Sequence, residues 1–194
     1  MTDRSGSVRW VTRDPTAPND LCFGPDGLLY VTDPTRSLDI DDGRIWRIDT
    51  ETGVSELLMS VPWYPNGIAF GPDGALYIAS FRTASIERYQ LQNGKLVGRE
   101  TVIQMTEGHP DGMAFDERGY LVIGAISTEG TRGTIQTWTT ENELVEVLEP
   151  GPNSAYTNLA LSEEKVLVVT DSDAGAVLAI DDWPAAGLPL YPFR

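Results

Sequence analysis

The chain has 194 residues, and its 14 Lys or Arg against 29 Asp or Glu give a formal net charge of −15 at pH 7. Such an acidic surface repels phosphate backbones and anionic lipid, which argues against nucleic acids and membranes as partners. Cys22 is the only cysteine, so an intramolecular disulfide is excluded, and we interpret it as a buried structural thiol. The chain starts without the apolar core of a signal peptide and has no apolar run of transmembrane length, so a cytoplasmic protein is expected.

The first part of the chain predicts a strand, a loop and a hairpin, in that order. Residues 8–11 (Val-Arg-Trp-Val) predict a short strand, and the proline-containing residues 14–18 predict a loop. Residues 19–30 read Asn-Asp-Leu-Cys-Phe-Gly-Pro-Asp-Gly-Leu-Leu-Tyr. Proline pre-sets φ and the Asp-Gly pair accepts a turn backbone, so two apolar runs joined by Pro-Asp-Gly predict a hairpin.

A polar loop and two more strands complete this first unit. The loop passes through Asp39, Asp41 and Asp42, but Gly43 does not stand where a calcium-binding EF-hand needs its glycine, so we interpret the loop as solvated. Residues 43–49 alternate in polarity and predict a third strand, and residues 54–58 predict a fourth.

The hairpin sequence then returns three times, starting at residues 66, 111 and 158, so the leading residues stand 47, 45 and 47 positions apart. A period of about 40–50 residues built from short strands is the signature of a β-propeller blade. The later units also repeat the outer strands, which are expected at residues 85–91, 95–102, 133–138, 144–148 and 175–180. We therefore predict an all-β fold, a β-propeller of about four four-stranded blades in a single domain. The predicted units are residues 19–65, 66–110, 111–157, and 158–194 completed by 1–18.

Each copy opens with a short polar residue that enters the innermost strand of its blade, where side chains can point at the central channel. These residues are Asn19, Asn66, Asp111 and Asn158, and Asp20 follows the first. Converging oxygen donors suit a hard cation such as Ca²⁺, Mg²⁺ or Mn²⁺, and suit Zn²⁺ less well. The alternative is that each residue caps its strand by bonding nearby backbone. Asp111 is a carboxylate where the other copies carry an amide, so it could both ligate a cation and act as a base.

Other chemistries find little support in the sequence. His109 is the only histidine, which excludes a site built from several imidazoles, and we interpret it as a loop residue near the channel mouth. The chain has no Gly-x-Ser-x-Gly nucleophile elbow, no phosphate-binding loop and no dinucleotide fingerprint.

Five motifs, in their order and spacing, resemble the family of senescence marker protein (regucalcin), gluconolactonase and luciferin-regenerating enzyme, over residues 19 to 173. They are Pro-Asn-Asp at 18–20, Leu-Tyr-Val-Thr-Asp-Pro at 29–34, Pro-Asn-Gly-Ile-Ala-Phe at 65–70, Pro-Asp-Gly-Met-Ala-Phe-Asp at 110–116 and Tyr-Thr-Asn at 156–158. The resemblance implies a six-bladed propeller with a divalent cation in its channel, of which this chain corresponds to the C-terminal four blades. It also implies hydrolysis of sugar-acid lactones and related esters.

By the same resemblance, Asn66 and Asp111 are metal ligands, Asp111 is also the general base, and Asn19 with Asp20 faces the substrate. Two departures stand out: no Glu-Gly-Pro motif with the family's first metal ligand lies within residues 1–18, and Ala17 replaces an arginine. We therefore expect a metal-dependent, gluconolactonase-like hydrolase, impaired by the missing glutamate, with Ca²⁺ favoured over Zn²⁺, Mg²⁺ and Mn²⁺. The expected partner is a small-molecule lactone or ester. The alternative is a non-catalytic binding or scaffold module that self-associates through open blade edges.

Overall fold

The structure is a computed structural model that describes residues 8–35, 42–127, 132–151 and 154–192, and all of its regular secondary structure is β. Within the described residues, fifteen strands form four antiparallel sheets, and each sheet consists of strands that are consecutive in the sequence. The first sheet holds β1 (Leu21–Phe23), β2 (Leu29–Asp33), β3 (Gly43–Ile48) and β4 (Ser55–Val61), and the second holds β5 (Pro65–Phe70), β6 (Leu76–Ser80), β7 (Ser85–Gln92) and β8 (Lys95–Gln104). The third holds β9 (His109–Phe115), β10 (Leu121–Ile126), β11 (Thr134–Trp138) and β12 (Leu144–Leu148), and the fourth holds β13 (Tyr156–Leu161), β14 (Leu167–Asp171) and β15 (Ala176–Ile180).

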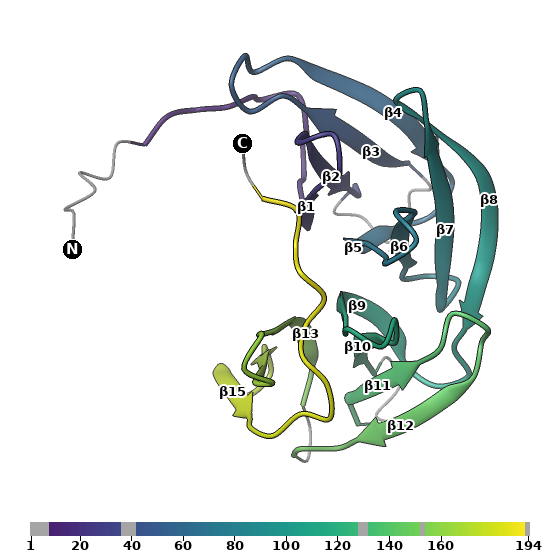
Figure 1. Cartoon of the computed structure of the whole chain (residues 1–194), viewed down its shortest axis with the longest axis vertical. Coiled ribbons are helices and arrows are strands. Elements are labelled where there is room, and N and C mark those ends of the chain that lie inside the picture. Colours follow the sequence, from purple (N-terminus) through teal and green to yellow (C-terminus); the bar gives the residue numbers. More distant parts are fainter. Residues whose placement is uncertain (1–7, 36–41, 128–131, 152–153, 193–194) are drawn as a thin grey trace.

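The sheets follow one another round an arc, with β1, β5, β9 and β13 on its inner side (Figure 1). This arrangement confirms the β-propeller predicted from the repeat, and apart from residues 8–11 the predicted strands are present within three residues of their expected bounds. The hairpin turns also form as expected, since Gly27 and Gly74 take φ of 79° and 73° and their amides bond back across the turn at 2.9 and 3.0 Å. Only glycine adopts this backbone without strain, so the turn chemistry sets the register of each hairpin.

Adjacent blades pack through aromatic residues that recur with the repeat. The ring of Tyr30 meets Phe70 edge-on at 5.0 Å, and in the next interface the ring of Tyr77 meets Phe115 at 4.8 Å. The two tyrosine hydroxyls donate to Asp26 and Asp73 in their own turns, so these buried rings keep hydrogen-bond partners. The first two copies of the repeat therefore each supply both the turn and one half of an aromatic contact with the next blade.

The ends of the described chain differ from expectation. The strand predicted at residues 8–11 is wrong, because Arg9 and Thr12 instead bond Thr50 and Ser55 at the β3–β4 turn. The fourth sheet has three strands, and the described residues 8–18 do not add a fourth. Part of the acidic loop interpreted as solvated, with Asp39 and Asp41, lies outside the described residues.

The C-terminal tail, residues 181–192, runs from β15 back across the inner strands towards β1 (Figure 1). Gly187 forms an isolated bridge with Asp116, the amide of Leu188 donates to Phe115 O at 2.9 Å, and the ring of Tyr191 meets Phe70 at 5.7 Å. The tail thus crosses the channel at the end where the hairpin turns lie. The described residues include no helix long and apolar enough to cross a membrane.

Candidate functional site

Two glycines allow the inner strands to approach closely at the point where each copy of the repeat begins. A Cβ added to Gly67 would lie 2.1 Å from Asp111 O, and one added to Gly112 would lie 2.2 Å from Asn158 Oδ1. Any side chain at these positions would therefore force the strands apart. Because the glycines directly follow Asn66 and Asp111, the close approach places the leading residues of successive blades side by side.

Asn66 is the most deeply buried of the candidate site residues, with 4% of its surface exposed. Its Nδ2 donates to Pro110 O at 3.4 Å, and its backbone carbonyl accepts from Thr32 Oγ1 at 2.7 Å. Its side-chain Oδ1 is buried and has no hydrogen-bond partner in the part of the chain that the structure describes. A buried acceptor without a donor is costly, so this oxygen is suited to a donor or cation that enters the site.

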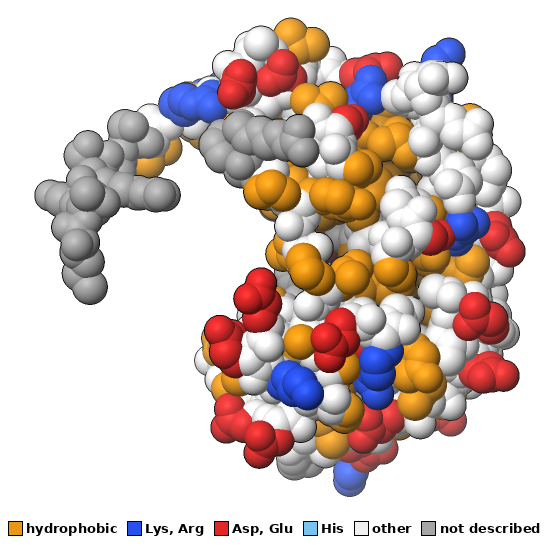
Figure 2. Space-filling model, viewed as in Figure 1, with side chains coloured by type: hydrophobic (Ala, Val, Ile, Leu, Met, Phe, Trp, Pro, Cys, Tyr) orange, Lys and Arg blue, Asp and Glu red, His pale blue; other side chains and the backbone are white. Residues whose placement is uncertain are grey.

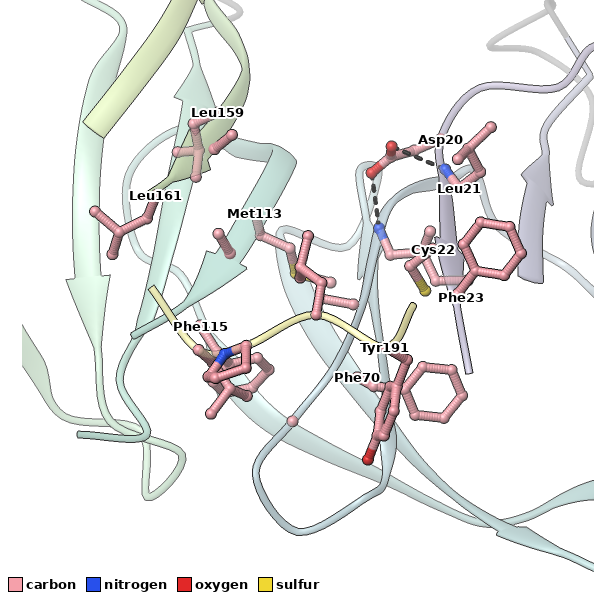
Figure 3. Close-up of a pocket in the computed structure, with 18 of the residues that line it drawn as sticks. Asp20, Leu21, Cys22, Phe23, Phe70, Met113, Phe115, Leu159, Leu161 and Tyr191 are labelled. Atoms are coloured by element: carbon pink, nitrogen blue, oxygen red, sulfur yellow. Dashed lines mark hydrogen bonds between the residues drawn. The ribbon is translucent and has the colours of Figure 1, made fainter. Parts of the chain in front are cut away.

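Asp20 joins the first blade to the second. Its Oδ1 accepts from the amide of Leu21 at 2.8 Å and its Oδ2 accepts from the amide of Ile68 at 3.1 Å (Figure 3). Burial raises the pKa of the Asp20 carboxyl, and the two amide donors partly offset that effect. Asp20 is thus a negative charge held in place by the backbone of two inner strands.

Asp111 is partly buried and stands next to both of these residues. Burial and, to a smaller extent, the negative charge of Asp20 raise the pKa of its carboxyl to about 7, although an interaction with Asn66 acts in the opposite direction. The carboxyl is therefore close to half-protonated at neutral pH, which is unusual for an aspartate. A bound positive charge would lower this pKa and favour the ionised carboxylate. The structure brings Asn66, Asp111 and Asp20 together.

The remaining two candidates are placed differently. Asn158 lies beside Gly112, and its Oδ1 accepts from the amide of Leu159 at 2.8 Å, which is the strand-capping arrangement considered as the alternative. Asn19 is exposed and pairs through its backbone amide with Thr32 O at 2.8 Å. Within the described ranges, no side-chain hydrogen bond joins Asn19 to the other candidates.

The side-chain oxygen atoms of Asp20, Asn66 and Asp111 are suitable ligands for a hard cation. They combine two carboxylates with the partnerless amide oxygen of Asn66, which are the oxygen ligands that Ca²⁺ and Mg²⁺ prefer. No group of three or more His, Cys, Asp or Glu side chains gathers anywhere in the described part of the chain. The protein would therefore supply only part of a coordination shell, and water would complete it.

A cavity of about 600 Å³ runs along the inner strands from Asp20, whereas Asn66 and Asp111 are not among its lining residues. Asp20, Asn158 and Tyr191 supply its polar side-chain groups, and the other walls come from the inner strands of all four sheets and from the tail. Asp20 lies at one end and Phe70 and Tyr191 at the other (Figure 3). Hydrophobic side chains gather on the concave side of the arc (Figure 2). Cys22 is among the lining residues and is half-buried rather than fully buried, and burial raises the pKa of its thiol.

His109, interpreted from the sequence as a loop residue, is instead the first residue of β9, and its side chain contacts Phe81. Its Nδ1 lies 2.6 Å from Phe81 O, and its ring packs against the ring of Phe81 at 4.9 Å. The sequence pattern also did not identify Thr32, whose hydroxyl donates to the backbone carbonyl of Asn66, because nothing in its local sequence distinguishes it from other strand threonines. The glycine that follows both Asn66 and Asp111 was visible in the repeat and could have predicted the close approach of the strands.

Comparisons with known proteins complete the description. A family model described as "SMP-30/Gluconolactonase/LRE-like region" matches residues 3–173. A search of curated protein sequences found no match. Among solved structures, a luciferin-regenerating enzyme aligns with a TM-score of 0.73 and 16% identity over 89% of this chain and 64% of that one.

Two further solved structures are similar in the same way. A calcium-binding protein, regucalcin from Agrobacterium tumefaciens, aligns with a TM-score of 0.70 and 23% identity over 90% of this chain and 64% of that one. A gluconolactonase from Xanthomonas campestris aligns with a TM-score of 0.65 and 23% identity over 79% of this chain and 54% of that one. The chain thus spans between 54% and 64% of the length of these structures. At this level of identity the likeness shows the β-propeller fold.

Proposed function

This chain belongs to the SMP-30/gluconolactonase/LRE-like family, and we propose that it is a metal-dependent hydrolase of lactones, of the gluconolactonase type. One observation carries the proposal: the carboxyl of Asp111, with its raised pKa, interacts with the side chain of Asn66, whose buried Oδ1 has no hydrogen-bond partner among the described residues. A carboxyl whose pKa lies near neutrality is suited to exchange protons at physiological pH. An amide oxygen that accepts no hydrogen bond is suited to coordinate a cation.

The metal ligands in this proposal are Asn66 and Asp111, with Ca²⁺ favoured and Zn²⁺, Mg²⁺ or Mn²⁺ as alternatives. When bound, such a cation polarises a carbonyl oxygen and lowers the pKa of water. The oxygen donors in the site support a hard cation, and the 23% identical regucalcin is described as a calcium-binding protein.

The chain's own residues have distinct roles in the proposed reaction. The carboxylate of Asp111 accepts a proton from the attacking water and returns it to the ring oxygen as the lactone opens. Asn66 interacts with that carboxylate and restricts its position, which favours one orientation for proton transfer. Asp20, held by two backbone amides, and Asn19, exposed at the rim, orient the substrate.

Hydrolysis of glucono-δ-lactone, followed by acid release at constant pH after removal of metals and then with each cation added, tests the proposal. We expect hydrolysis that depends on the cation and falls at least about 100-fold in Asp111→Ala. Asp173→Ala, which removes an exposed carboxylate from the fourth blade, is the matched control and should keep the wild-type rate. Equal rates in wild type and Asp111→Ala, with no heat of calcium binding, would instead favour the non-catalytic binding module.

A further inference from the structure

The cavity beside Asp20 suggests which lactones the site takes. Resting on the proposed function, we propose that the site prefers lactones or esters with an apolar alkyl or aryl substituent, whose chain lies in this cavity, over polyhydroxylated sugar lactones. A volume of about 600 Å³ is in the range of cavities that enclose small-molecule ligands.

The walls offer few polar side chains to sugar hydroxyls. The lining side chains are carbon-rich, and they include Phe70, Met113, Phe115 and Leu159. The polar lining side chains are those of Asp20, Asn158 and Tyr191, and both oxygens of Asp20 and Oδ1 of Asn158 each accept one backbone amide, which reduces their capacity for hydroxyl donors. Several hydroxyl groups buried here would replace only part of their hydrogen bonds to water, whereas methylene groups would gain by leaving water.

The charge at the polar end restricts the head group. Asp20 places a negative charge at the cavity. An anionic head, such as that of a fatty acid, would be repelled by it, while an uncharged lactone or ester would not. The polar end therefore favours a neutral carbonyl head with its apolar chain directed away from the Asp20 carboxylate.

The far end of the cavity is formed by the tail. Leu190 lines the cavity with 87% of its surface exposed, and Tyr191 is held against Phe70. The fourth blade lines the cavity over residues 158–161, a length of about 10 Å at about 3.3 Å per strand residue. A substrate substituent of this length would cover apolar surface that is otherwise exposed to water.

A series of δ-lactones carrying no substituent, a propyl, a pentyl or a heptyl chain tests this inference, with glucono-δ-lactone for comparison. We expect kcat/KM to rise about two- to fourfold for each methylene that the cavity buries. In parallel, calorimetry with the matching lactams, whose ring amide resists hydrolysis, should show the same rise in affinity. A flat series in both measurements, or decanoate binding as tightly as the heptyl lactam, would overturn the inference.

Two matched variants separate the cavity from the rest of the fold. Ala160 is exposed and lines the cavity. Val168 pairs with Ala160 on one side and with Ala179 on the other, so the two alanines lie in the same cross-strand row. Ala179 is also exposed but does not line the cavity, which makes it a matched control. Ala160→Phe should abolish the chain-length dependence and Ala179→Phe should preserve it. An unchanged dependence in Ala160→Phe would overturn the inference.

The outcomes also distinguish this inference from the proposed function. If lactam affinity rises with chain length and Ala160→Phe removes that rise, but no lactone is hydrolysed, the cavity assignment stands and the hydrolase proposal fails. If glucono-δ-lactone is hydrolysed while chain length changes neither measurement, the hydrolase proposal stands and the cavity assignment is overturned.

Discussion

The carboxyl of Asp111 should make the stability of the metal-free protein depend on pH. In the unfolded chain an aspartate titrates near 3.8, whereas in the folded protein the pKa of this group is about 7. Between these values the folded protein binds a proton that the unfolded chain releases, so stability falls as pH rises and the loss is complete above the folded pKa. A shift of about 3 units at about 1.36 kcal/mol per unit corresponds to about 4 kcal/mol. Because the site is partly open to water, we expect about 2 to 4 kcal/mol.

The substitution Asp111→Asn removes this titration and keeps the shape of the side chain. Urea unfolding in the presence of a chelator should show the variant more stable than wild type by about 2 to 4 kcal/mol at pH 8, and nearly equal to it at pH 4. Asp173→Asn, at an exposed position, should follow the wild-type profile. Calcium at 100 times its dissociation constant should add about 2.7 kcal/mol to wild type and less to Asp111→Asn. Parallel pH profiles for wild type and Asp111→Asn would refute the reasoning.

Three further substitutions test how the site is held. Gly67→Ala should lower the free energy of unfolding by about 1 to 3 kcal/mol, because its Cβ would meet Asp111 O at 2.1 Å; an unchanged urea midpoint would contradict this close approach. Thr32→Val removes the 2.7 Å hydrogen bond to Asn66 O and should cost about 1 to 2 kcal/mol in the same assay, whereas no cost would show that the bond adds nothing to stability. Asp33→Ala leaves two backbone amides, an indole and a guanidinium without their buried carboxylate, so we expect a loss of about 3 to 5 kcal/mol, measured as a lower melting temperature. A loss under about 1 kcal/mol would contradict that role.

The blade plan was predictable because its signals are local. Proline and Asp-Gly at residues 25–27 and 72–74 specify a turn from within a few residues, and the alternation at residues 43–49 specifies a strand with one buried face. The strand predicted at residues 8–11 failed because a strand needs a neighbouring edge. Here the backbone segment meets the β3–β4 turn instead, through Arg9 and Thr12.

The candidate site was predictable in part. The repeat singled out Asn66 and Asp111, which the structure places together, and also Asn19, whose side chain it does not bring into contact with them. Repeat position indicates where a residue enters a blade but not where its side chain ends. Asn158 shows the difference, since it occupies the same repeat position and caps its own strand.

By itself, the sequence determined the kind of fold, the family and the residue types that could carry chemistry, because turns, alternation and repeat spacing depend on neighbouring residues. The raised pKa of Asp111 could be recognised only in the folded chain, because it depends on burial and on Asp20 in another blade. The tertiary structure also decided the path of the tail, which packs Tyr191 against Phe70 and so forms one end of the cavity. Desolvation and electrostatic interaction depend on all the atoms around a group, and most of those atoms come from distant parts of the chain.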